Sequence, residues 1–149
     1  MPWSEGLPDS ADGEGGDLAN YEATVRSNHF KVKNPKAFER WCKKRRLDFW
    51  TERQPEGTNL YAISSECGGW PSWDPDTNRD FNIATDITRH LDGYVAVFLE
   101  IGFEKLRYME GQAIAVHPDG RVVSINLSDI YEKARDAFGP DVTVTEAVY

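Results

Sequence analysis

Cys67 is the residue whose surroundings most suggest covalent chemistry, because it precedes Gly68-Gly69 in a stretch rich in Gly and Pro. A thiol beside flexible backbone can act as a nucleophile when a nearby base lowers its pKa. The sequence carries no signature of such a base, and two glycines are also what a tight loop requires. A cysteine-dependent enzyme centred on Cys67 is therefore kept as an alternative, and Cys42 is expected in the core.

Metal and cofactor chemistry finds little support in the spacing of the polar residues. The three histidines, His29, His90 and His117, lack the local pairing that tetrahedral zinc sites usually show. The segment WDPDTNRDF at 73–81 has alternating acidic residues but lacks the central Gly and terminal Glu of a calcium loop. Gly68-Gly69 is not followed by the Lys-Ser/Thr of a phosphate loop. We therefore expect no metal, no cofactor and no enzymatic activity.

Two tryptophans are the most informative residues, because both lie in a Gly-, Pro- and Asp-rich stretch at 66–79 that we expect to be a long irregular loop. Aromatic residues on loops are favoured anchors of protein interfaces. The alternative is that both indoles fold back onto the sheet edge or a small core. Nearby carboxylates are suited to charge-assisted hydrogen bonds from Lys or Arg of a partner. The predicted partner-binding residues are Trp70, Trp73, Asp74, Asp76 and Asp80.

A basic segment at 31–46 offers a second kind of surface. Clustered cations with interleaved aromatic residues are typical of nucleic-acid contacts. However, Phe38 and Trp41 fit the apolar stripe of a helix, and the whole chain is acidic, with a pI near 4.9. A nucleic-acid or nucleotide-binding module is therefore an alternative function. Its basic patch would comprise Lys31, Lys33, Lys36, Arg40, Lys43, Lys44, Arg45 and Arg46.

Charge is distributed unevenly along the 149 residues, whose net charge is −8. Residues 1–20 carry −5, residues 21–53 carry +6 and residues 54–149 carry −9. Such separation can steer association with a charged partner, although solvated faces of different sign are also ordinary. Residues 1–19 are too poor in apolar groups to offset ordering entropy, so we expect a disordered acidic arm. A single domain at 20–149 follows.

Capping and turn signals predict the elements that position these residues. Helices are expected to begin at Asn34-Pro35, at Asp80 or Asn82, and at Ser128. Strands are predicted at 21–32, 47–52, 59–65, 94–101, 106–109, 112–117, 123–127 and 142–148. Hairpins outnumber helical crossovers, so we predict an α+β fold in which a mainly antiparallel sheet carries about three helices on one face.

The last hairpin and helix carry a regular apolar pattern. The turn HPDGR at 117–121 joins two strands, and Val123, Ile125 and Leu127 alternate on the return strand. Ile130, Ala134 and Ala137 or Phe138 form the stripe of the last helix. Both sets of side chains are expected to face the core.

Composition also indicates the cellular compartment. No apolar run approaches the ~20 residues of a membrane-spanning helix, and the N-terminus has no signal-peptide pattern. Two cysteines are too few for a disulfide-built secreted domain, although one bridge between them stays possible in principle. We expect a cytoplasmic protein without a membrane partner.

Three segments, NYEATVRSN at 20–28, CGGWPS at 67–72 and EKLRY at 104–108, resemble small acidic proteins of bacterial plasmids, phages and other mobile elements. The resemblance runs from about residue 20 to 149 and specifies no chemistry. It implies a genetic context in which small acidic proteins often act as antirestriction or anti-CRISPR factors. Residues 21–149 carry only −3, so local acidic mimicry is expected rather than a full DNA mimic.

The leading hypothesis is a non-enzymatic protein that binds and inhibits a nucleic-acid-handling defence complex in a bacterial host cell. It combines the charge layout, the aromatic acidic loop and the resemblance. Its oligomeric state is left open.

Overall fold

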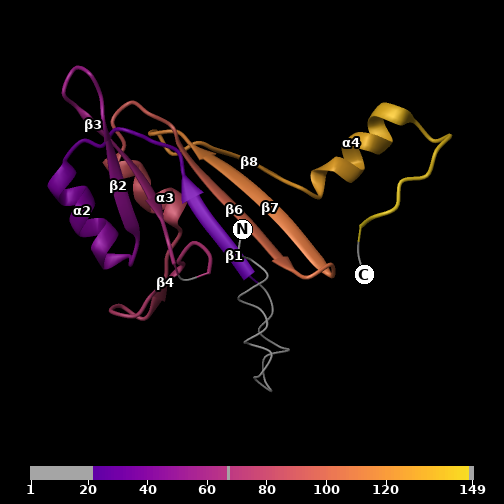
Figure 1. The fold of residues 1–149 in the computed structure, drawn as a ribbon, viewed down its shortest axis with the longest axis horizontal. Coiled ribbons are helices and arrows are strands. Elements are labelled where there is room, and N and C mark those ends of the chain that lie inside the picture. Colours follow the sequence, from indigo (N-terminus) through magenta and orange to yellow (C-terminus); the bar gives the residue numbers. More distant parts are fainter. Residues whose placement is uncertain (1–21, 67, 148–149) are drawn as a thin grey trace.

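A six-stranded antiparallel sheet organises the chain in the computed structural model, which describes residues 22–66 and 68–147 (Figure 1). The strand order is β2-β3-β1-β6-β7-β8, and β4 and β5 form a separate hairpin. The strands are β1 (Glu22–Ser27), β2 (Asp48–Arg53), β3 (Asn59–Ser64), β4 (Trp73–Asp74), β5 (Arg79–Asp80), β6 (Ala96–Glu104), β7 (Tyr108–Val116) and β8 (Val122–Asn126).

The helices of the described residues are α2 (Pro35–Lys44), α3 (Ile83–Ile87), the 3-10 helix η2 (Thr88–His90) and α4 (Asp129–Phe138). The predicted α+β class with a mainly antiparallel sheet is confirmed. Helices α2 and α3 pack against one face of the sheet, whereas α4 extends away from it (Figure 1). No helix of the described residues combines the length and the apolar character that a membrane crossing requires.

Helix α2 begins where the sequence predicts. The side chain of Asn34 accepts a hydrogen bond from the backbone N–H of Ala37 at 3.1 Å, and Pro35 occupies the first turn. The apolar stripe of the helix, Phe38, Trp41 and Cys42, is buried. This stripe supplies one wall of the core.

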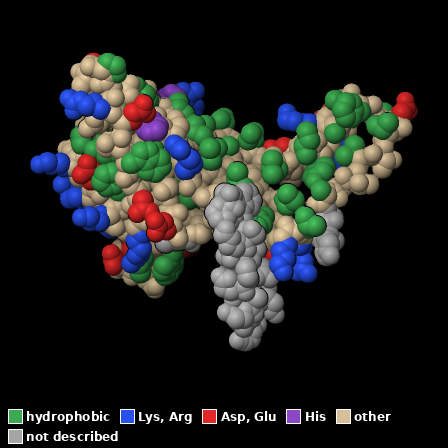
Figure 2. All heavy atoms as spheres, in the orientation of Figure 1, with side chains coloured by type: hydrophobic (Ala, Val, Ile, Leu, Met, Phe, Trp, Pro, Cys, Tyr) green, Lys and Arg blue, Asp and Glu red, His purple; other side chains and the backbone are tan. Residues whose placement is uncertain are grey.

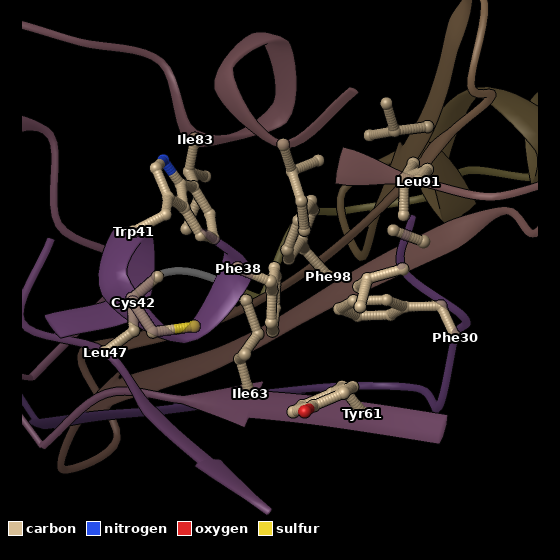
Figure 3. Close-up of a cluster of buried hydrophobic side chains, with 14 of the residues drawn as sticks. Phe30, Phe38, Trp41, Cys42, Leu47, Tyr61, Ile63, Ile83, Leu91 and Phe98 are labelled. Atoms are coloured by element: carbon tan, nitrogen blue, oxygen red, sulfur yellow. The ribbon is translucent and has the colours of Figure 1, made fainter. Parts of the chain in front are cut away.

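The core is an aromatic cluster centred on Phe38 (Figure 3). Its ring centroid lies 5.7 Å from Phe30, 5.5 Å from Trp41, 5.1 Å from Tyr61 and 5.6 Å from His90. The contacts of Phe38 with Phe30, Tyr61 and His90 are edge-to-face, a geometry that adds stability beyond the burial of the rings. Helices α2, α3 and η2 therefore cover strands β3, β1 and β6. We call this packed part of the chain the body.

Several predicted boundaries change. The strand expected at 21–32 ends at Ser27, and Phe30 and Val32 form only isolated bridges with Tyr61 and Leu91. The strands expected at 106–109 and 112–117 are one strand, β7, because Gly111 continues the pairing with β6.

The closing strand predicted at 142–148 is wrong for residues 142–147, which form no strand. These residues follow α4, which extends away from the sheet, so no strand edge of the described residues lies beside them to complete a ladder (Figure 1). The acidic arm predicted at 1–19 lies outside the described residues, as does Cys67.

Candidate interaction surfaces

The irregular loop predicted at 66–79 is correct for residues 68–72, which include Trp70 and form no helix or strand, whereas residues 73–80 form a hairpin of β4 and β5. Trp73 pairs with Asp80 and Asp74 pairs with Arg79 across the two short strands. The backbone N–H of Phe81 donates to the Ser72 carbonyl at 2.9 Å, which closes the base of the hairpin. The chain reverses through Asn78, whose φ of 59° is a left-handed conformation that Asn tolerates.

Asp74 fastens this hairpin to the body. Its side chain is 6% exposed, and Oδ2 accepts hydrogen bonds from Arg45 Nη1 at 3.0 Å and from the Thr77 hydroxyl at 3.1 Å. Oδ1 accepts from the backbone N–H of Asp76 at 2.9 Å. Burial opposes ionisation of Asp74, but these hydrogen bonds and the Arg45 charge outweigh it and lower its pKa. Asp74 is thus occupied within the chain and not presented to a partner.

Arg45 bridges two carboxylates. Its Nε donates to Asp86 Oδ2 at 2.9 Å, and its guanidinium lies 4.0 Å above the centre of the Phe81 ring. Trp41 Nε1 also donates to Asp86 Oδ2, at 2.7 Å. Burial opposes ionisation of Asp86 as well, and the donors from Trp41 and Arg45 overcome it, so its pKa is lowered. Arg45 therefore belongs to this buried network and not to the basic patch.

The two tryptophans have different roles. Trp70 is partly buried, with its ring centroid 5.0 Å from Phe98 and its Nε1 donating to the Leu99 carbonyl at 3.2 Å. It lines a cavity of about 210 Å³ together with Phe81 and Ile114. Trp73 is 49% exposed. The alternative that the indoles fold back thus applies to Trp70 alone.

Three predicted partner-binding residues remain on the outside of the hairpin. Trp73, Asp76 and Asp80 are all exposed, and neither Asp76 nor Asp80 forms an ion pair within the described residues. We call these three residues the hairpin surface. An exposed aromatic side chain opposite one carboxylate, with a second carboxylate in the turn of the same hairpin, suits a basic protein partner.

The basic patch lies on the outer side of α2. In Figure 2, Lys and Arg side chains gather along the edge of the molecule where α2 runs. Lys31 lies 3.7 Å from Asp92, so its charge is partly compensated. The exposed members of the predicted patch are Lys33, Lys36, Arg40, Lys43, Lys44 and Arg46.

The histidines do not converge. His29 Nε2 lies 3.5 Å from Glu52, His117 Nδ1 accepts from the backbone N–H of Asp119, and His90 is buried in the core. The described residues contain no group of three or more His, Cys, Asp or Glu placed to hold a metal ion. Burial and the nearby Glu39 raise the pKa of the buried Cys42 to about 12, which leaves it a protonated core thiol.

A surface that the sequence analysis missed lies at the C-terminal arm, which we define as β8 and α4, residues 122–138. All residues of β8 are exposed, and α4 buries none of its side chains. Val123 is 70%, Ile125 62% and Phe138 68% exposed. The expectation that these residues face the core is therefore wrong for this chain. Their apolar pattern was visible in the sequence, but the sequence did not show that no other described element packs on it.

Comparisons of the chain with protein-family models, curated proteins and solved structures found no match. The surfaces that bear on function are therefore the hairpin surface, the outer side of α2 and the C-terminal arm.

Proposed function

We propose that this protein acts by binding another protein through the hairpin surface, as a non-enzymatic inhibitor of a nucleic-acid-handling defence complex in the bacterial cytoplasm. The observation that carries the proposal is the half-exposed Trp73 on an anchored hairpin, with Asp80 opposite it and Asp76 in the turn of the same hairpin. Tryptophan is among the residue types that dominate binding energy when a partner desolvates them.

The anchoring of the hairpin supports this use. Arg45, Asp74 and Asp86 hold a very short two-stranded element in place with nearly buried charges. Because the displayed side chains are already positioned, less conformational entropy is lost when a partner binds. A loose loop carrying the same residues would bind more weakly.

The charges of the surface support the class of target. Proteins that handle nucleic acids present Lys and Arg to phosphate groups. Exposed carboxylates at Asp76 and Asp80 can accept charge-assisted hydrogen bonds from such cations, and opposite charges also speed the encounter. Trp73 then supplies the desolvated anchor.

The test is a plasmid-protection assay. Bacteria carrying an active restriction or CRISPR system are transformed with a targeted plasmid, with and without this chain. The wild type should restore transformation. Trp73→Ala should lose at least about 2 kcal/mol of binding, roughly a 30-fold weakening, and the protection with it.

Trp50→Ala is the matched control, because Trp50 is 37% exposed but lies on β2, away from the hairpin. It should protect as well as the wild type. No protection by the wild type in any such system contradicts the inhibitory role, and full protection by Trp73→Ala contradicts the use of this surface.

A second candidate function, nucleic-acid binding, is favoured by the outer side of α2. Lys36, Arg40, Lys43 and Lys44 are exposed there, and none forms an ion pair within the described residues. Such binding should fall steeply with salt. A gel-shift series compares Lys43→Gln/Lys44→Gln with Lys133→Gln/Arg135→Gln on α4. No shift at low salt removes this candidate.

A further inference from the structure

Within the described residues, the apolar stripe of α4 has no sheet packed against it, and one face of the sheet has no helix packed on it. The apolar stripe of α4, formed by Ile130 and Phe138 around Ala134, is not packed against any other described element (Figure 1). Helices of about ten residues are marginal in water unless an amphipathic face is packed. We therefore expect α4 to be stabilised by packing on an apolar surface.

The register of the sheet identifies a matching surface. Leu99 pairs with Ala113, which pairs with Ile125, so these three side chains lie in one row on the same face. Phe98, the neighbour of Leu99, points to the opposite face and into the core. The row therefore lies on the face away from α2 and α3, which we call the open face.

Two further rows extend the open face. Val97 pairs with Ala115, which pairs with Val123, and Ile101 pairs with Gly111, next to Leu127. Leu99, Ile101, Val123, Ile125 and Leu127 are all exposed. The residues of β7 in these rows are small, so the side chains of β6 and β8 stand on either side of a shallow trough about 10 Å wide, the spacing of two strand neighbours and the diameter of a helix. The Leu127 side chain lies over Gly111 and closes one end of this trough.

Within one chain this helix does not reach this trough. Only Leu127 and Ser128 separate β8 from α4, and the helix continues outward from the end of β8 (Figure 1). In the space-filling view, hydrophobic side chains are spread over the surface of the arm (Figure 2). Helix and trough are complementary but held apart, which is the condition for exchange between two copies.

The edge strand β8 also favours a second copy of this chain as the partner. Its sequence, VVSIN, has no charge and no proline, and such an exposed edge is a template for another strand. In an antiparallel pair of two β8 strands centred on Ser124, Val123 of one copy lies opposite Ile125 of the other. A chain of net charge −8 repels its own copies, so a neutral edge is the place where two copies approach at least electrostatic cost.

We propose that the C-terminal arm binds a second copy of this chain: the β8 edges pair antiparallel, and α4 of each copy turns at Leu127 and Ser128 to pack on the open face of the other. A strand of about 16 Å and a helix of about 15 Å, each about 10 Å wide, cover roughly 300 Å². Each copy buries its own strand edge and helix, and also about 150 Å² of open face under the partner's helix, so roughly 450 Å² per copy is buried, a little over half of the roughly 800 Å² per partner of standard stable interfaces.

The mass in solution tests the proposal. Analytical ultracentrifugation of the full chain at micromolar concentration should give twice 16.9 kDa. Val123→Lys/Ile125→Lys should give the single-chain mass, because it places charge at the pairing edge. Leu106→Lys is the matched control, since Leu106 is 77% exposed in the β6–β7 turn, and it should remain dimeric. A monomeric wild type, or a dimeric double variant, overturns the proposal.

A crosslink tests the register separately. In a Cys67→Ser background, Ser124→Cys places two thiols at the twofold axis, and mild oxidation should join two chains. Lys133→Cys in the same background serves as the exposed control and should crosslink more slowly. Equal rates for the two variants contradict the pairing of β8. The hairpin surface is elsewhere on the chain, so Trp73→Ala should dimerise as the wild type does, and the failure of either proposal leaves the other standing.

Discussion

Helices α2 and α4 are both amphipathic and ten residues long, but they differ in burial. Helix α2 buries Phe38, Trp41 and Cys42 against the sheet, whereas α4 buries no side chain at all. The apolar pattern is the same kind in both, so pattern alone does not decide burial. What differs is whether the chain brings an apolar surface opposite the helix.

The sheet shows the same contrast. In β3, Leu60, Tyr61, Ala62 and Ile63 are buried, while every residue of β8 is exposed. Strand β3 lies between β2 and β1 beneath α2, and β8 is an edge with a single neighbour. Apolar strands at an edge are normally covered or blocked by charge, and β8 has neither within the described residues. The apolar residues of the body are therefore covered within one chain, whereas those of the C-terminal arm are left exposed by the described residues.

The largest expected effect separates two phenylalanines. Phe38→Ala removes a fully buried ring from the centre of the core and should cost about 3–5 kcal/mol of unfolding free energy. Phe138→Ala removes an exposed ring and should cost less than about 0.5 kcal/mol in dilute solution. Urea unfolding measures both. Comparable costs would show that α4 packs within its own chain and would end the contrast.

The next effect concerns the hairpin anchor. Arg45→Met leaves the carboxylates of Asp74 and Asp86 buried without their shared cation, which should cost about 3 kcal/mol. Tryptic cleavage after Arg79 should also accelerate, because the hairpin loses its attachment. Arg89→Met is the control: Arg89 contacts the same Asp86 at 3.1 Å but is 62% exposed, so its loss should cost less than about 1 kcal/mol.

Helix capping gives a smaller effect. Asn34→Ala removes the hydrogen bond to the N–H of Ala37 and should lower the unfolding free energy by about 1 kcal/mol. Ser128 makes no side-chain capping bond to α4, so Ser128→Ala should change it by only a few tenths. Chemical denaturation of both variants sharpens the comparison of the helices. A larger loss of unfolding free energy for Ser128→Ala than for Asn34→Ala would contradict this difference in capping.

The smallest effect is a pH dependence located in the body. Burial between Phe38 and Trp41, together with the charge of Arg89, lowers the pKa of His90 below its usual 6.5, while Asp86 opposes this shift. The unfolded chain then binds the proton more readily than the folded one. Stability should be complete above pH 6.5 and decline as the pH falls from there toward the lowered pKa. Urea midpoints at pH 7, 6 and 5 measure this, and His90→Phe should reduce the slope.

Local signals predicted much of the fold because they depend on neighbouring residues. Asn34-Pro35 opens a helix wherever the chain places it, and Asp119-Gly120 turns the β7–β8 hairpin. The candidate site was harder to predict. Trp70 and Trp73 are alike in sequence context, yet only Trp70 meets Phe98, which lies in another element.

Asp74 shows the same limit more clearly. Its carboxylate was predicted to meet a partner, and it meets Arg45, 29 residues earlier in the chain. Such a pair depends on how α2 and the hairpin come together. No spacing rule of strands or helices reports it, since those rules connect residues only a few positions apart.

The sequence by itself determined the α+β class, the start of α2, the apolar stripes of the helices and the uneven charge, since these follow from side-chain type and local periodicity. Tertiary structure decided which stripes are covered, which tryptophan is displayed and which charges are neutralised. Burial is a relation between surfaces that are distant in the chain, so the apolar residues of β3 became core, whereas those of β8 remain exposed.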